Sequence, residues 1–123
     1  MTEEWGKLPR LSWKELLQLF IGQRARFQVT GRSMLPLLQP GDEVIVNRKA
    51  YQDQPPEPGD VALAWHPYQP TQKIIKLVAA VESDRCLLIG QNSAESTDSR
   101  SFGWVSRDLL IGKVTCQFRV GNG

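Results

Sequence analysis

The sequence predicts a mostly β domain preceded by one short amphipathic helix, and three observations support this fold class. Apolar residues recur with a helical period only between residues 12 and 22. From residue 26 onward, short runs alternate polar and apolar residues or are rich in β-branched ones. Turns rich in Pro and Gly separate these runs. Short strands joined in this way are typical of an antiparallel sheet.

The helix is expected over residues 12–22. Ser12 and Glu15 have the spacing of a capping box, and Gly22 can end the helix. Between them the apolar residues fall at i, i+3, i+4, i+7 and i+8 and form one stripe. These residues are Trp13, Leu16, Leu17, Phe20 and Ile21. We expect the stripe to pack on the sheet; the alternative is a docking surface for a partner or a membrane.

Six strands are expected after the helix, and all of them belong to one β domain at about 26–120 within a single-domain chain of 123 residues. A proline-rich loop is expected at 52–60 and an irregular polar segment at 90–103. The predicted strands are 26–30, 43–47, 61–65, 73–81, 86–89 and 112–120.

Composition excludes several classes of function. The net charge is only +2 and the basic residues are scattered, which argues against nucleic acid as a partner. Cys86 and Cys116 have no CxxC neighbour, so we expect buried free thiols and neither a metal site nor a cofactor. No targeting segment is visible, and no apolar run approaches the roughly 20 residues of a membrane helix. We therefore expect a soluble, cytoplasmic protein without a stable membrane anchor.

The stretch from Gly31 to Asp42 presents a serine, Ser33, on a stiff segment. Gly31 permits a positive φ or a crowded backbone, and Pro36 fixes its own φ and keeps Leu35 out of the α region. A lone serine in such a turn is ordinary. As a nucleophile it would need a base, because a free hydroxyl is barely ionised at neutral pH.

Three side chains could be that base. His66, the only histidine, lies beside a Pro turn and is expected to be a surface or packing residue. Lys73 and Lys76 lie three apart on the longest strand and so project to opposite faces. Lys73 is expected to be solvated. Lys76 has apolar neighbours, and its burial would lower its pKa; reaching about 7 from about 10.4 costs on the order of 4–5 kcal/mol. Alternatively, its stem packs on the sheet while its head reaches water.

The polar segment 90–103 is the third element of the candidate site. It places hydroxyls, carboxylates and an arginine between two glycines. Asp98 and Arg100 could form an ion pair, and a serine hydroxyl could orient a nearby amine. From its composition alone, this segment is a turn-rich loop held by hydrogen bonds from side chains to the backbone.

Together these elements resemble the ordered motifs of the type I signal peptidases. The motifs are Gly-x-Ser-Met-x-Pro-x-Leu-x-x-Gly-Asp at 31–42, Pro-Gly-Asp-Val at 58–61, Ile-Lys at 75–76 and Gly-x-Asn-x-x-x-Ser-x-Asp-Ser-Arg-x-Phe-Gly at 90–103. Within this family, two motifs most resemble one small branch, the nickel-type superoxide dismutase maturation proteases. They are the Gly-Arg-Ser-Met form of the first motif and the Ala-Glu-Ser-Thr-Asp-Ser-Arg-Ser-Phe-Gly form of the last.

The resemblance implies a role for each matching residue. Ser33 would be the nucleophile, Lys76 the general base, and Ser96 the hydroxyl that orients the Lys76 amine. The Ser33 backbone N–H, with Arg32 and Gly31 beside it, would form the oxyanion hole. An extended substrate would lie between residues 27–30 and 72–75, against Phe27, Val29, Ile74 and Ile75. Structural support would come from Asp98, Arg100, Met34 and Pro36.

This chain departs from the family pattern at three positions. Gly31 replaces the hydroxyl residue that some signal peptidases carry two residues before the nucleophile. Gln91 stands where the family usually has Asp, and Leu77 where it has Arg. The departures leave the charge network around the site, and one oxyanion donor, without their usual residues.

The function implied by the resemblance is a serine endopeptidase that removes the N-terminal propeptide of a nickel superoxide dismutase precursor, without a metal of its own. Three alternatives stay open: a signal-peptidase-like protease acting on other precursors, a self-cleaving repressor-type domain, and a non-catalytic β domain that binds peptide strands. The repressor type would need Ala-Gly or Cys-Gly ahead of the serine, and residues 1–30 contain neither.

Overall fold

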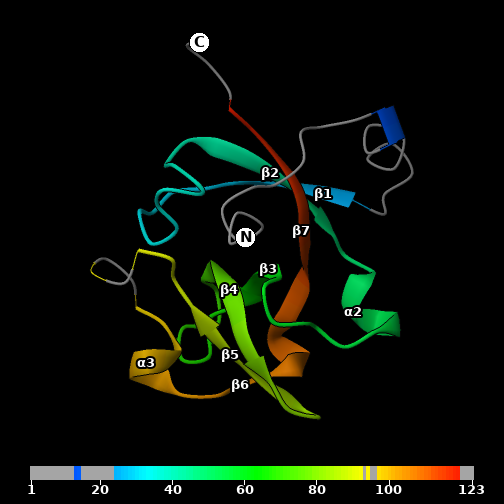
Figure 1. Ribbon diagram of the computed structural model, residues 1–123, viewed down its shortest axis with the longest axis vertical. Helices are drawn as coiled ribbons and strands as arrows, with labels where there is room; N and C mark the ends of the chain where they lie inside the picture. The colour runs from blue at the N-terminus through cyan, green and yellow to red at the C-terminus, as the bar shows by residue number, and fades with distance from the viewer. Residues whose placement is uncertain (1–12, 15–23, 93, 95–96, 120–123) are drawn as a thin grey trace.

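The computed structural model describes residues 13–14, 24–92, 94 and 97–119. Its core is one antiparallel sheet with the strand order β1-β2-β7-β3-β4-β5-β6 (Figure 1). The strands are β1 (Arg24–Gln28), β2 (Asp42–Asn47), β3 (Val61–Trp65), β4 (Lys73–Val81), β5 (Arg85–Ile89), β6 (Val105–Ser106) and β7 (Leu110–Arg119). The mostly β, antiparallel fold predicted from the sequence is therefore confirmed.

The last long strand, β7, joins the two halves of the sheet. Its first residues pair with β3 and the remainder pairs with β2, so that Lys113 has both Ala62 and Asn47 as strand neighbours. In Figure 1 β7 runs down the length of the molecule, with β1 and β2 at its upper end and β3 to β6 around its lower end. The resulting sheet is curled, and side chains of β1 and β4, which are not neighbours in the sheet, pack in one apolar cluster.

Two apolar clusters lie on the opposite faces of this sheet, as alternation along β4 shows. Ile75 and Leu77 belong to the first cluster, whereas Ile74 and Val78 belong to the second. The first cluster also contains Val29, Met34, Leu37, Leu38, Val44, Val46, Val61, Leu63 and Val114. The second adds Ala62, Ala64, Cys86, Leu88 and Val105. Lys76 lies between Ile75 and Leu77 on β4, a strand whose middle residues are all buried.

Strand boundaries agree closely with the sequence prediction, and most differences are at the ends. The strands β3 and β4 match it in full, while β1 lies two residues earlier than 26–30. Two short helices replace parts of the predicted loops: α2 (Ala50–Asp53) overlaps the proline-rich loop, and α3 (Ser99–Phe102) lies in the polar segment. The second is explained by Asp98, whose carboxylate caps the backbone N–H of Arg100. A 3-10 turn, η3 (Arg107–Leu109), precedes β7.

Only Trp13 and Lys14 of the predicted N-terminal helix are described, and both are helical. Trp13 is 86% exposed, so the prediction that this side chain packs on the sheet is wrong. The other residues of that helix lie outside the described residues. Within the described part of the chain, no helix has the length and apolar character needed to cross a bilayer. Both cysteines are buried and free, as predicted.

Candidate active site

The serine lies on the loop between β1 and β2, and backbone hydrogen bonds close this loop at its base. The Val29 N–H donates to the Asp42 carbonyl (2.8 Å), and the Gly41 N–H donates to the Val29 carbonyl (2.8 Å). Gly41 has a φ of 94°, which a glycine adopts readily in the Pro-Gly-Asp turn. Inside the loop, Met34 is 1% exposed in the first cluster and anchors the residue next to Ser33, which is itself half-buried.

Two residues predicted to shape this loop behave differently from each other. Pro36 follows a cis peptide bond from Leu35. Gly31 has no positive φ, and a Cβ built on it would meet no atom within 4 Å. The expectation that Gly31 is needed for a left-handed or crowded backbone is therefore wrong. The backbone here has room for a side chain, and the absence of one is not explained by packing.

A second segment, Gly90–Asn92, holds the serine loop from the side. The Asn92 N–H donates to the carbonyl of Ser33 (2.7 Å), and Asn92 Nδ2 donates to the carbonyl of Arg32 (3.0 Å). The Leu37 N–H donates to Gln91 Oε1 (3.1 Å). These three hydrogen bonds join residues that lie more than 50 positions apart in the sequence. We call Gln91 and Asn92 the clamp.

The lysine lies in the middle of β4, one residue from the point where that strand changes partner. Lys76 pairs with Ala62 of β3, whereas the ladder with β5 begins at the next residue, Leu77, opposite Ile89. Ile89 is followed directly by Gly90 and then by the clamp residues Gln91 and Asn92. Lys73 is exposed, as the sequence predicted, and Lys76 is 5% exposed, which decides for the buried of its two predicted alternatives.

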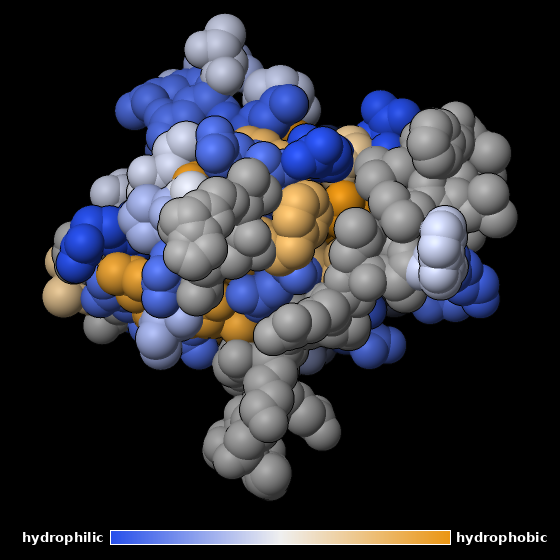
Figure 2. Space-filling view, turned by 90° about the horizontal axis from the view of Figure 1, so that it is seen from above, coloured by the Kyte–Doolittle hydropathy of each residue, from blue (hydrophilic) through white to orange (hydrophobic). Residues whose placement is uncertain are grey.

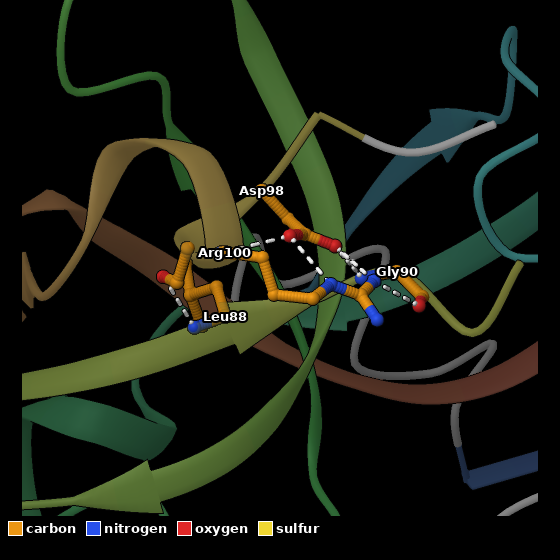
Figure 3. A network of polar contacts seen from close by, with 5 residues as sticks. Leu88, Gly90, Asp98 and Arg100 are labelled. Atoms are coloured by element: carbon orange, nitrogen blue, oxygen red, sulfur yellow. Dashed lines mark hydrogen bonds and ion pairs between the residues drawn. The ribbon is translucent and has the colours of Figure 1, made fainter. Parts of the chain in front are cut away.

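An ion pair between Asp98 and Arg100 holds Gly90, the residue before the clamp (Figure 3). Arg100 Nη2 lies 2.5 Å from Asp98 Oδ2, and Arg100 Nε donates to Asp98 Oδ1 (3.1 Å). Asp98 Oδ2 also accepts from the Gly90 N–H (2.7 Å), and Arg100 Nη2 donates to the Gly90 carbonyl (3.1 Å). Figure 3 shows both side chains meeting the backbone of Gly90. The pairing predicted from the sequence is present, with Asp98 1% exposed.

These charges act on Lys76. Burial lowers the pKa of the Lys76 amine below its ordinary value, because the charged form loses hydration. The Asp98 carboxylate opposes this effect and raises the pKa, whereas the Arg100 guanidinium lowers it. The net direction is downward, so the neutral amine is more accessible in this environment than it would be in water.

Of the four residues predicted to line the substrate strand, three belong to the first apolar cluster or pack against it. Val29 and Ile75 are buried in the first cluster, and Phe27 is partly buried against it. Ile74 faces the second cluster instead. On the face turned toward the viewer in Figure 2, apolar side chains reach the surface among hydrophilic ones. A cavity of about 400 Å³ lies elsewhere, around Tyr51 and Asp60.

Two further residues from the sequence analysis, Ser96 and His66, and the expectation about metals remain to be compared with the structure. Ser96 lies outside the described residues. His66 is a packing residue: its Nδ1 accepts the N–H groups of Tyr68 (3.0 Å) and Gln69 (3.1 Å), and its ring lies edge-on to Phe102. The described residues contain no group of His, Cys, Asp and Glu that could hold a metal ion.

The sequence reasoning missed the clamp as a contact to the serine loop. The family pattern marks Gln91 only as a departure and indicates no role for Asn92. The available signal was their position, since two long polar side chains directly follow a buried strand. The sequence reasoning also missed Ser99, whose Oγ accepts the Leu88 N–H (2.8 Å) in the interior.

A curled antiparallel sheet, a serine loop hydrogen-bonded to Gln91 and Asn92, a buried lysine on β4 and an Asp-Arg pair that binds Gly90 are the features of a β domain of the signal-peptidase type. Comparison with known proteins agrees. The model of the family "Signal peptidase, peptidase S26" matches residues 16–86 and 79–119. The chain belongs to this family.

Two curated proteins are similar to the chain, and both are named mitochondrial inner membrane protease subunit 2. The mouse protein (Mus musculus) is 34% identical over 110 residues, which cover 72% of this chain and 63% of the mouse protein. The zebrafish protein (Danio rerio) is 30% identical over 110 residues, covering 72% of this chain and 60% of its own length. The match thus spans somewhat less than two thirds of either relative.

Proposed function

We propose that the chain is a serine endopeptidase in which Ser33 is the nucleophile and Lys76 the general base. One observation carries this proposal: a buried lysine with a lowered pKa and the serine loop are both tied to β5. Leu77, the residue after Lys76, pairs with Ile89 at the end of β5. The segment Gly90–Asn92 follows Ile89, and its Asn92 N–H donates to the Ser33 carbonyl. A neutral amine can accept the proton of a serine hydroxyl, which an ammonium group cannot.

The proposed reaction has two halves. Neutral Lys76 takes the proton of Ser33 Oγ as that oxygen attacks the scissile carbonyl, and the Lys76 ammonium then protonates the leaving amine. In the second half, Lys76 activates a water molecule that releases the acyl group from Ser33. The oxyanion is stabilised by the Ser33 backbone N–H within the loop of Gly31 and Arg32. Ser96 orients the amine in this mechanism.

The proposed substrate lies as an extended strand between residues 27–30 and 72–75. Two features of the sheet support this position. In the strand order β1 is the outermost strand on its side, and Lys73–Ile75 has a strand neighbour on one side only among the described strands, since the β5 ladder begins at Leu77. Backbone hydrogen bonds to such edges give affinity, and pockets for alternate side chains give specificity.

We further propose that the substrate is the precursor of a nickel superoxide dismutase, with cleavage removing its N-terminal extension. Support comes from the residues of the motifs at 31–42 and 90–103, which resemble the corresponding motifs of the proteases that perform this maturation. Cleavage would free the new N-terminal amine and the residues beside it, which then ligate nickel in the product. The nickel belongs to the substrate and takes no part in the proteolysis.

The two curated relatives favour a second candidate, a protease that processes other precursors. Their printed name places them at a membrane and makes them subunits of a protease. By that likeness, this chain would act beside a membrane or a partner subunit. Sedimentation with vesicles, or processing only in their presence, would favour this candidate over the superoxide dismutase precursor.

The test is incubation with a nickel superoxide dismutase precursor, followed by mass determination of the product's new N-terminus. We expect one cut, lost in Ser33→Ala and in Lys76→Ala while circular dichroism shows an unchanged fold. Lys49→Ala, which removes an exposed lysine in the turn after β2, is the matched control and should cleave like the wild type. Cleavage by Lys76→Ala at near the wild-type rate would exclude the dyad. Binding of every precursor without cleavage would favour the non-catalytic peptide-binding domain.

A further inference from the structure

The two peptide groups on either side of Ser33 are both held by one residue, Asn92. Its backbone N–H donates to the Ser33 carbonyl at 2.7 Å, and its side-chain Nδ2 donates to the Arg32 carbonyl at 3.0 Å. We propose that Asn92 is the positioning residue that aims the Ser33 N–H at the oxyanion. This inference rests on the proposed function and adds to it a residue that acts through the backbone of the nucleophile.

The peptide group is planar, and this planarity couples the Arg32 carbonyl to the Ser33 N–H. The Arg32 carbonyl and the Ser33 N–H belong to the same peptide unit, whose atoms lie in one plane with the two groups pointing in opposite directions. A hydrogen bond that fixes the carbonyl therefore also fixes the direction of the N–H. The second bond, to the Ser33 carbonyl, fixes the peptide unit that follows. Rotation of the Ser33 backbone is thus restricted from both sides.

Asn92 can hold these groups because its own segment is firmly held. Gly90 donates to Asp98 and accepts from Arg100, and both side chains form an ion pair. Gln91 accepts the Leu37 N–H at 3.1 Å, farther along the serine loop. The charged pair that acts on Lys76 is therefore connected, through two residues of backbone, to the peptide groups of Ser33.

The bond to the Arg32 carbonyl has an electrostatic consequence as well as a geometric one. A donor on the carbonyl oxygen polarises the peptide group and makes its N–H a stronger donor, because hydrogen bonds in a chain reinforce one another. The effect matters more here than in a site with a second donor at position 31. That position is Gly31, which has no side chain to offer the oxyanion. Stabilisation of the oxyanion therefore depends on the Ser33 backbone N–H.

The experiment compares two substitutions of Asn92 with a matched control. Asn92→Ala removes the side-chain donor without adding charge. Asn92→Asp keeps the shape and replaces the donor with an acceptor facing the Arg32 carbonyl. Asn47→Asp adds the same charge at a side chain whose Oδ1 only accepts the Lys49 N–H (2.9 Å), a role that a carboxylate retains. All are assayed for cleavage of the precursor, with kcat and KM determined separately.

Loss of a complete oxyanion donor costs about 10²–10³-fold in kcat, so we expect misdirection of that donor to cost about 10–100-fold. KM should stay within about twofold, because ground-state binding does not use the oxyanion donor. The midpoint of the pH profile of Asn92→Ala should equal that of the wild type, since no charge changes near Lys76. Asn47→Asp should match the wild type in all three quantities.

A second measurement needs no substrate. In ¹⁵N-labelled protein, the Ser33 amide should become more mobile and exchange faster with solvent in both Asn92 variants, while amides of β3 stay unchanged. Unaltered kcat and an unaltered Ser33 amide in Asn92→Ala would overturn the positioning role while leaving the protease intact. An equal loss of kcat and rise of KM together with general loosening would overturn it in favour of a structural role. A wild type that cleaves no precursor would overturn the proposed function and this inference with it.

Discussion

The guanidinium of Arg100 lies against the buried carboxylate of Asp98, with Nη2 2.5 Å from Oδ2, and the two charges act on Lys76 in opposite directions. Asp98 raises the pKa of the amine and Arg100 lowers it, while burial supplies the largest effect and lowers it. The pair therefore influences the pKa of the lysine, in addition to holding Gly90. Its two halves can be separated by mutation.

The first prediction concerns the pH dependence of cleavage. Arg100→Met removes the charge that lowers the Lys76 pKa, so the rise of kcat/KM with pH should move to a higher pH. Asp98→Asn removes the charge that raises it, so the same rise should move to a lower pH. Arg100→Lys keeps the positive charge and should leave the midpoint close to that of the wild type. The measurement is kcat/KM across the pH range in which each variant remains folded.

Shifts of the same sign in Arg100→Met and Asp98→Asn would contradict this account, because the two charges act oppositely on one amine. No shift in either would show that the titrating group is not Lys76. Since Asp98 also accepts the Gly90 N–H, its substitution should weaken the fold, and thermal unfolding of each variant is needed to define the usable pH range.

The second prediction concerns stability. A buried lysine with a lowered pKa makes the folded state bind protons less readily than the unfolded state. Lys76→Met should therefore be more stable than the wild type, and below the folded-state pKa the difference should be about 1.4 kcal/mol for each unit by which the pKa is lowered. The advantage should be constant below the folded-state pKa. It should shrink as the pH rises from that value toward about 10.4, where the unfolded lysine also loses its proton.

Urea unfolding at several pH values would measure this difference. Lys73→Met provides the control, because Lys73 is exposed and no burial penalty is removed. A Lys76→Met protein that is less stable than the wild type at neutral pH would mean that the attraction between the ammonium and Asp98 outweighs the cost of burial and the repulsion by Arg100.

Period-two patterns predicted the sheet well because they report which side chains are buried, and burial is what selects the strands. The strand β4 is an example: its run of apolar residues predicted its bounds, whereas the burial of Lys76 was one of two alternatives that the sequence left open. The short helix α3 was missed because one side-chain cap at Asp98 and a handful of residues leave no periodic signal.

The clamp could not be predicted from periodicity at all. Whether Asn92 meets Ser33 depends on how strongly the sheet curls and on which loops it brings together, and neither is written in any local pattern. Gly31 shows the reverse case. A glycine before a functional serine suggested a conformational requirement, but neither its φ nor the space around it imposes one. A glycine's role has to be read from the backbone around it.

The third prediction tests a glycine that packing does require. A Cβ at Gly112, on β7, would lie 2.5 Å from the Asn47 carbonyl oxygen and 2.7 Å from Val46 Cγ1. Because the first of these atoms belongs to the backbone of the paired strand β2, the strands must separate to admit even a methyl group. Gly112→Ala should therefore lower the free energy of unfolding by about 1–3 kcal/mol, measured by urea denaturation. Gly31→Ala, with open space at its Cβ, is the control and should be neutral or slightly stabilising.

The last prediction asks whether the serine loop can take a donor that it lacks. Gly31→Ser places a hydroxyl two residues before Ser33, and neither the φ nor the surroundings of Gly31 oppose it. If this hydroxyl reaches the oxyanion, kcat should rise by about 2–10-fold, less than the value of an optimally placed donor. Gly31→Ala separates the hydroxyl from the mere loss of glycine flexibility. The gain should be larger in an Asn92→Ala background, because a side-chain donor at position 31 partly replaces the one whose aim has been lost. A fall in kcat for Gly31→Ser, with Gly31→Ala unchanged, would show that the added hydroxyl competes with the oxyanion for the Ser33 N–H.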